Sequence, residues 1–124
     1  MALVNNESIL MSIKKMLNVD SEEQAFDTAI GTFINAEFMN LHQLGIGPEG
    51  FAVYDADVRW TDFSQDESLI QTVKEYVFMR VKMIFDPPGS SVVADAINSR
   101  IAELEFRLNV QAEKAWQKEE AGET

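Results

Sequence analysis

The sequence has no cysteine among its 124 residues and only one histidine, His42. Missing thiols exclude disulfides, thiolate metal ligands and a cysteine nucleophile. A single imidazole leaves no second histidine for a metal site of recognisable spacing. The sequence also lacks a nucleophile elbow, a phosphate-binding loop after a strand and a calcium-loop pattern. We therefore expect a protein that is not an enzyme and that uses no cofactor or metal.

Basic residues are scarce: 10 Lys and Arg stand against 21 Asp and Glu, and the net charge is −11. The only adjacent basic pair is Lys14-Lys15. Because a protein that grips a nucleic-acid backbone needs clustered Lys and Arg, specific DNA binding is disfavoured. The acidic excess is either an ordinary soluble exterior or a surface past which DNA slides without sticking.

Long apolar runs are missing as well. No stretch of about 18 apolar residues occurs, so we expect no membrane-spanning helix and no membrane partner. The N-terminal MALVNNESIL lacks the basic-then-apolar layout of a signal peptide, which favours a chain made in the cytoplasm. The hydrophobic fraction of 46% is that of a folded protein. The length favours one domain over 1–124, with a core over about 7–110 and a polar tail over 111–124.

Apolar residues at helical spacing predict a mainly α fold, a bundle of about four helices. The first is short, is capped by Asn5 or Asn6 and ends near Leu17. The second is expected to start at the capping pair Asp20-Ser21 and to end near Leu44. The remaining two are expected over about 66–85 and 91–117.

The segment 45–63, between the second and third expected helices, reads as a long loop. Its pieces 51–54 and 58–60 look extended, which suggests a short β-hairpin around 55–57. Long ordered loops are often functional. Three aromatic residues in it either anchor a partner or tie the loop to its own core: Tyr54, Trp60 and Phe63. Four acidic residues accompany them: Glu49, Asp55, Asp57 and Asp62.

The third expected helix is apolar on more sides than one core contact requires, so another subunit is expected to cover one side. It ends in FDPPGSS, where the prolines stop the helix and Ser90 or Ser91 caps the next one. This corner is expected to fix the angle between the last two helices. The candidate subunit interface comprises Phe78, Met79, Met83, Phe85, Pro87 and Pro88.

The last expected helix carries a seam of apolar residues spaced 4, 3 and 4 apart. They are Ile97, Ile101, Leu104 and Leu108. Two heptads are too few for an independent coiled coil, so this seam predicts antiparallel packing on the third helix. Glu103 and Arg107 form a favourable i,i+4 pair on the same helix.

The stretch YVFMRVKMIFDPPGSS (76–91), continued by IAELEFRLNVQ (101–111), resembles the small head–tail connector proteins of tailed bacteriophages. These are also called head-completion or adaptor proteins. SIKKML (12–17), INAEFMNLHQLGIGP (34–48) and WTDF (60–63) look similar to the same family. The resemblance implies a helical subunit of the virion that forms a ring of about twelve or thirteen copies beneath the portal.

Such a ring extends the DNA channel, helps to retain the packaged genome and offers a platform to the next tail-completion, or stopper, protein. DNA then passes transiently and non-specifically, and the acidic residues Glu49, Asp55, Asp57 and Asp62 either line the channel or rim or simply solvate the loop. The C-terminal segment is expected to dock on the portal through Val110 and Trp116. The alternative is a non-catalytic soluble adaptor or regulatory module that binds a protein through its helical face.

Overall fold

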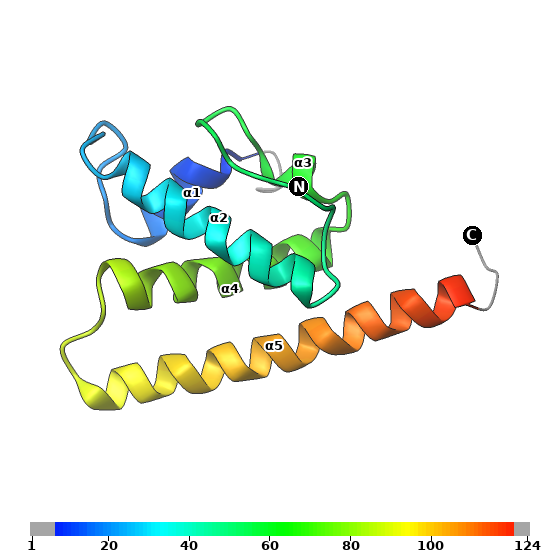
Figure 1. Ribbon diagram of the computed structural model, residues 1–124. Helices are drawn as coiled ribbons and strands as arrows, with labels where there is room; N and C mark the ends of the chain where they lie inside the picture. Colours follow the sequence, from blue (N-terminus) through cyan, green and yellow to red (C-terminus); the bar gives the residue numbers. More distant parts are fainter. Residues whose placement is uncertain (1–6, 121–124) are drawn as a thin grey trace.

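The computed structural model describes residues 7–120. Five helices follow one another (Figure 1): α1 (Ile9–Met16), α2 (Asp27–Gln43), the single-turn α3 (Trp60–Phe63), α4 (Glu67–Phe85) and α5 (Ser91–Glu120). Within the described residues no strand forms. The mainly α fold with about four substantial helices is therefore confirmed.

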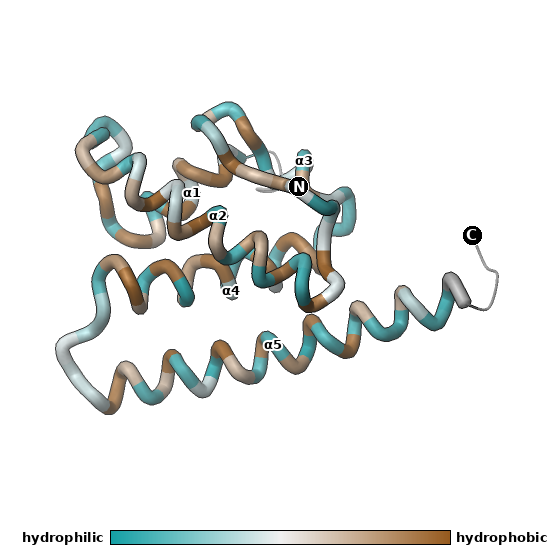
Figure 2. The backbone as a smooth tube through the Cα atoms, in the orientation of Figure 1, coloured by the Kyte–Doolittle hydropathy of each residue, from teal (hydrophilic) through white to brown (hydrophobic). Residues whose placement is uncertain are grey.

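α4 lies in the middle of the bundle, with α1 and α2 on one side and α5 on the other (Figure 1). Hydrophobic residues concentrate where α1, α2 and α4 meet, whereas α5 alternates between hydrophobic and hydrophilic along its length (Figure 2). The fully buried side chains of the core include Ile9, Ile13, Ile30, Ile34, Leu41, Trp60, Ile70, Val73, Val77, Val81 and Leu108. One core thus unites all of the longer helices.

Side-chain caps set the beginnings of α1 and α4. Ser8 Oγ accepts a hydrogen bond from Met11 N (3.2 Å), and Asp66 Oδ1 accepts bonds from Ser68 N (3.0 Å) and Leu69 N (3.2 Å). The expected caps of the first helix, Asn5 and Asn6, lie outside the described residues. For α4 the expected bounds are confirmed.

The expected start of the second helix at Asp20-Ser21 is wrong, because α2 begins only at Asp27. The Asp20 carboxylate accepts a hydrogen bond from Glu22 N (2.9 Å), and the Glu23 carboxylate accepts one from Ala25 N (2.9 Å). Acidic side chains that bond the backbone two residues onward stabilise turns in competition with a helix. Residues 18–26 therefore form a loop.

The expected hairpin of the long loop is also wrong. Residues 58–60 pair with the segment before α1, through Ile9 N to Val58 O (2.9 Å) and Trp60 N to Glu7 O (3.1 Å). The other piece, around Val53, is held by a side chain: Asn35 accepts from Val53 N (2.7 Å) and donates to Val53 O (3.0 Å). Because Asn35 bonds both the N–H and the C=O of Val53, these backbone groups are not available to pair with residues 58–60.

The FDPPGSS corner turns the chain so that α5 runs back antiparallel to α4 (Figure 1). Asp86, with φ −151° and ψ 69°, lies outside the helical region, which the following proline disfavours. Ser90 caps α5, because its carbonyl accepts from Ala94 N (3.0 Å) and its hydroxyl from Val93 N (3.4 Å). In the expected seam, Ile101, Leu104 and Leu108 are buried and Ile97 is half-buried. The antiparallel packing of the last two helices is confirmed.

Candidate assembly interfaces

A bidentate ion pair joins α5 to α4 beside the apolar seam. Arg100 donates from Nε to Glu75 Oε2 (2.7 Å) and from Nη2 to Glu75 Oε1 (2.9 Å). Glu103 contacts the same guanidinium at 2.6 Å. The hydrogen bond from Arg100 lowers the pKa of the Glu75 carboxyl, although partial burial opposes the shift. Ionised Glu75 thus favours the docked position of α5.

Replacing Glu75 with glutamine is expected to lower the melting temperature at neutral pH. Because folding lowers the pKa of Glu75 below its ordinary value of 4.5, the stabilisation is present above pH 4.5 and is lost as pH falls through the folded pKa. The difference between wild type and Glu75→Gln should therefore shrink well below pH 4.5. Thermal unfolding followed by circular dichroism across pH tests this, and a constant difference would contradict it.

A line of polar contacts crosses the bundle from α2 to α5. Glu37, only 2% exposed, accepts from Arg80 Nε (2.8 Å) and from Asn40 Nδ2 (3.0 Å). On α4, Tyr76 donates its hydroxyl to Glu105 Oε2 on α5 (3.0 Å). Burial raises the pKa of Tyr76 well above its ordinary value, so the hydroxyl stays a donor. Sequence reasoning singled out none of these residues, because each looks like an ordinary polar position until the helices pack.

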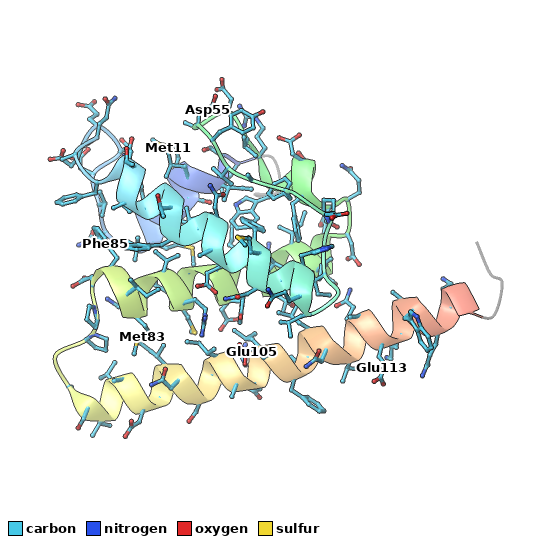
Figure 3. All side chains as sticks on the ribbon, in the orientation of Figure 1. Met11, Asp55, Met83, Phe85, Glu105 and Glu113 are labelled. Carbon is cyan, nitrogen blue, oxygen red and sulfur yellow. The ribbon has the colours of Figure 1, made fainter. Side chains whose placement is uncertain are left out.

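The candidate subunit-interface residues lie along the second half of α4 and its corner. Phe78, Met79, Met83 and Phe85 are half-buried and pack against the core, so the subunit already uses part of each. Figure 3 labels Met83 and Phe85 at the end of α4 that leads into the corner. Pro87 is exposed and Pro88 is half-buried.

The corner carries three more exposed apolar side chains. We call Ile84, Val92 and Val93 the corner residues; Val92 is 76% exposed. The sequence pattern places Ile84 in the apolar stripe of the third expected helix and Val93 in the seam, four residues before Ile97, but both side chains are exposed. The buried part of each helix therefore ends before the corner.

The aromatic residues of the long loop fall into two groups. Trp60 is fully buried and Phe63 nearly so, and Phe63 packs against Phe38 and Phe51 with ring centroids 5.1 and 5.2 Å apart. These two therefore tie the loop to its own core, the second of the two expected alternatives, and they are not available to a partner while this packing holds. Tyr54 is different, because its side chain is 82% exposed.

The acidic residues of the loop are all exposed, as a channel lining or a solvated loop would require. Two of them also bond the backbone locally: Asp55 Oδ1 accepts from Asp57 N (2.8 Å), and Asp62 Oδ2 accepts from Arg59 N (2.8 Å). Asp55 stands at the outer edge of the molecule, on the side away from α5 (Figure 3). All four side chains remain exposed to solvent, including those of Asp55 and Asp62, which bond the backbone.

The C-terminal end of α5 projects beyond the rest of the bundle (Figure 1). Its last close approach is at Ala112, whose Cβ would lie 3.1 Å from a Cβ added to Gly45. Beside this approach is a shallow groove of about 570 Å³. Its apolar lining comes from Leu44, Phe106, Val110, Ala112 and Trp116.

Past Ala112, the side chains of residues 113–118 are exposed. Trp116 is 60% exposed, and Glu113 marks the start of the projecting part in Figure 3. We call residues 113–120 the arm. An exposed tryptophan on a helix without a covering element is typical of a protein–protein contact. The candidate portal-docking residues Val110 and Trp116 thus lie at the base of the arm and within it.

The residues from 7 to 120 contain no group of three or more histidine, aspartate or glutamate side chains placed to hold a metal ion. No helix in that range is both long and apolar enough to span a bilayer. What the described surface offers is a set of exposed apolar side chains at the corner and along the end of α5. Exposed apolar side chains of this kind are typical of surfaces that bind other proteins.

Comparison with known proteins agrees with this picture. A family model described as phage connector protein matches residues 9–115. No curated protein and no solved structure matches the chain. The family implies a structural, non-catalytic role at the phage head–tail junction, where its members assemble with other virion proteins. Because the match runs from the start of α1 to the arm, the chain is itself a member of the phage connector protein family.

Proposed function

We propose that this protein forms the head–tail connector ring beneath the portal, with about twelve copies related by a rotation axis. The observation that carries the proposal is the family match over 9–115. The ring extends the DNA channel, helps to retain the packaged genome and presents a platform to the stopper protein of the tail. The mainly helical subunit, with exposed apolar residues at the corner and at the C-terminal end of α5, supports this role.

A ring requires two different surfaces on each subunit, because each copy contacts its neighbours head to tail. One surface is the outer side of Phe78, Met79, Met83 and Phe85 together with Pro87 and Pro88. The corner residues Ile84, Val92 and Val93 extend it with side chains that the subunit leaves uncovered. The neighbouring copy covers this surface with a different part of its own bundle.

The acidic loop residues line the channel or its rim. Glu49, Asp55, Asp57 and Asp62 are exposed, and the whole chain carries a net charge of −11. Like charge keeps passing DNA from sticking to the wall. Tyr54 follows Val53, whose backbone N–H and C=O are both bonded by Asn35. An exposed tyrosine suits a contact with the next protein of the tail.

The arm, with the part of α5 that leads into it, docks on the portal. Val110 and Trp116 both line the groove beside Gly45, and the Trp116 side chain is 60% exposed. Inserted into an apolar pocket, Trp116 would supply most of the affinity of this contact, as buried aromatic anchors usually do. The last four residues of the expected docking segment, 121–124, lie outside the described part of the chain.

Cryo-electron microscopy of the portal vertex, together with quantitative mass spectrometry of purified particles, tests the proposal. We expect about a dozen copies per particle, arranged as one ring beneath the portal. The alternative, a soluble adaptor or regulatory module, predicts a protein that is present in infected cells and absent from purified particles. That result would overturn the connector proposal.

Replacing Pro87 and Pro88 together with alanine is expected to weaken ring assembly more than it destabilises the monomer. The two prolines restrict the backbone between α4 and α5, and alanine would let the corner residues move relative to the rest of the surface. Ring formation on portal-bearing heads and the melting temperature of the monomer are measured in parallel. Pro48→Ala, which changes the remaining exposed proline in the long loop, is the control. Intact assembly in the double variant would show that the corner is only a loop.

A further inference from the structure

The loop between α1 and α2 is held to the body at very few points. Every side chain from Asp20 to Phe26 is exposed, so this stretch buries no apolar residue of its own. We call residues 20–26 the strap. A segment without buried side chains has little to resist local opening, and its attachments therefore decide whether it stays closed.

Lys14 of α1 is the first attachment. Its side chain is only 1% exposed, and its ammonium group faces three oxygen atoms: Ser21 O (3.3 Å), Glu23 O (2.7 Å) and Asp27 Oδ1 (2.8 Å). The ammonium group donates hydrogen bonds to the two carbonyls and forms an ion pair with the Asp27 carboxylate. Two of the three acceptors are backbone carbonyls of the strap, and the third belongs to the first residue of α2. One buried lysine thus fastens both the strap and its junction with α2.

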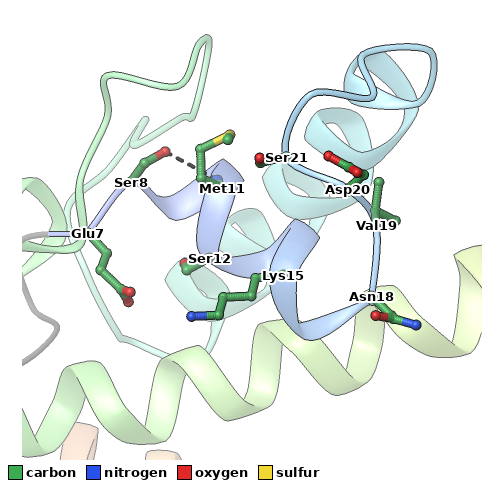
Figure 4. Close-up of a pocket in the computed structure, with 9 residues that line it drawn as sticks. All are labelled: Glu7, Ser8, Met11, Ser12, Lys15, Asn18, Val19, Asp20 and Ser21. Carbon is green, nitrogen blue, oxygen red and sulfur yellow. Dashed lines mark hydrogen bonds between the residues drawn. The ribbon is translucent and has the colours of Figure 1, made fainter.

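Side-chain packing between α1 and the start of the strap is sparse. A hollow of about 670 Å³ lies between α1 and the chain that leads into the strap (Figure 4). Its walls are Met11 and Lys15 on the helix and the turn from Asn18 to Ser21 on the other side. Because no side chain fills this space, the closed position depends on Lys14 more than on packing.

The second attachment reaches the corner. Phe26, the last residue of the strap, packs edge to face on Phe85 with ring centroids 5.4 Å apart and planes at 76°. Phe85 is the final residue of α4 and belongs to the proposed subunit interface. Phe26 directly precedes Asp27, which Lys14 holds, so the Lys14 contacts position Phe26 over Phe85.

We propose that the strap is a detachable cover of the subunit interface. Closed, it shields Phe85 and limits contact between free subunits; opened, it adds Phe85 to the corner residues and lets a second copy of this chain bind there. This inference rests on the proposed ring function, because the second copy is the occupant. The cover keeps subunits apart until assembly, since the uncovered apolar surface is smaller in the free protein.

The test compares Lys14→Met with Lys15→Met in the full-length protein. Both variants lose one positive charge from the same helix, but Lys14 is buried against the strap and Lys15 is exposed. Methionine keeps most of the buried stem of Lys14 and removes the group that holds the strap. Asp27→Asn is a milder second variant, which keeps Lys14 and its two carbonyl partners and remains informative if Lys14→Met fails to fold.

Hydrogen exchange and sedimentation velocity are the two measurements. In Lys14→Met we expect amides of residues 22–27 to exchange at least about tenfold faster than in Lys15→Met, because hydrogen bonds to a charged group are lost. We also expect self-association to become at least about tenfold stronger. Asp27→Asn should show smaller changes of the same sign.

Two results would overturn the inference. Unchanged exchange in the strap would show that Lys14 does not fasten it, and faster exchange without stronger self-association would show that the strap is not a cover. Neither result touches the connector proposal, which is decided by the location and copy number of the wild-type protein in particles. The wild-type protein could be absent from particles while Lys14→Met shows faster strap exchange and stronger self-association. The strap would then cover an interface of an assembly other than the connector ring.

Discussion

Replacing Trp60 with alanine is expected to destabilise the protein by about 3–5 kcal/mol, the usual cost of emptying a buried tryptophan site. Trp60 is fully buried, and its indole donates to Ser12 Oγ (2.8 Å). Its backbone amide also donates to Glu7 O (3.1 Å), so the residue joins the loop to the segment before α1. A small domain has only about 5–15 kcal/mol in total, so this one change should remove a large share of the free energy of unfolding.

Trp116→Ala is the matched control, because it makes the same chemical change at a side chain that is 60% exposed. Its effect on the free energy of unfolding should stay within about 0.5 kcal/mol. Trp60→Phe should lie between the two, since it keeps an aromatic ring but loses the bond to Ser12. Urea unfolding followed by circular dichroism measures all three. Equal midpoints for Trp60→Ala and Trp116→Ala would show that the loop is not part of the core.

The elements that sequence reasoning predicted well are those whose signals are local. α4 has a capping aspartate directly before it and a proline pair directly after it. The seam of α5 lies within a single helix, and its partner helix is the preceding one along the chain. Neighbouring residues are enough to specify such elements, because the caps, the stripe and the stop all act within a few residues.

The elements that were predicted wrongly depend on contacts between distant residues. The start of α2 is delayed by the turns that Asp20 and Glu23 stabilise locally and by Lys14, which holds two carbonyls of the strap from α1. Nothing in the sequence of residues 20–26 shows that lysine. The hairpin fails because Asn35, about 18 residues away, takes the backbone groups of Val53. In both cases a side chain elsewhere offers the backbone a better partner than local structure does.

The candidate interfaces also combine features that local sequence predicts with features that depend on distant contacts. Sequence reasoning left two alternatives for Tyr54, a partner contact or a contact with its own core, and the structure shows an exposed side chain. Trp60 is buried although it lies in the same loop as Tyr54, because which aromatic faces inward is decided by the path of the loop over the core. Ile84 and Val93 have the spacing of core residues in the sequence, but both are exposed, because the packing of α4 and α5 ends before the corner.

Truncation after Val110 is expected to abolish attachment to the portal while leaving the monomer folded. It removes the arm and Ala112 but keeps Ile101, Leu104 and Leu108, the buried residues that hold α5 on α4. The exposed side chains of residues 113–118 contribute little to the core, so the melting temperature should fall by only a small amount. Binding to portal-bearing heads should be lost, because the exposed tryptophan anchor is gone.

Two further chains separate the arm from the base on which it rests. Truncation after Ala112 keeps the close approach to Gly45 and removes only the arm, so it should restore the monomer's stability and still fail to bind. The full-length Trp116→Ala variant should bind at least about tenfold more weakly than wild type, as loss of an aromatic hot spot usually causes. If the chain truncated after Val110 still decorates portal-bearing heads, the portal contact lies elsewhere on the bundle. The corner residues would then be the next surface to change, since they are three exposed apolar side chains close together in the chain.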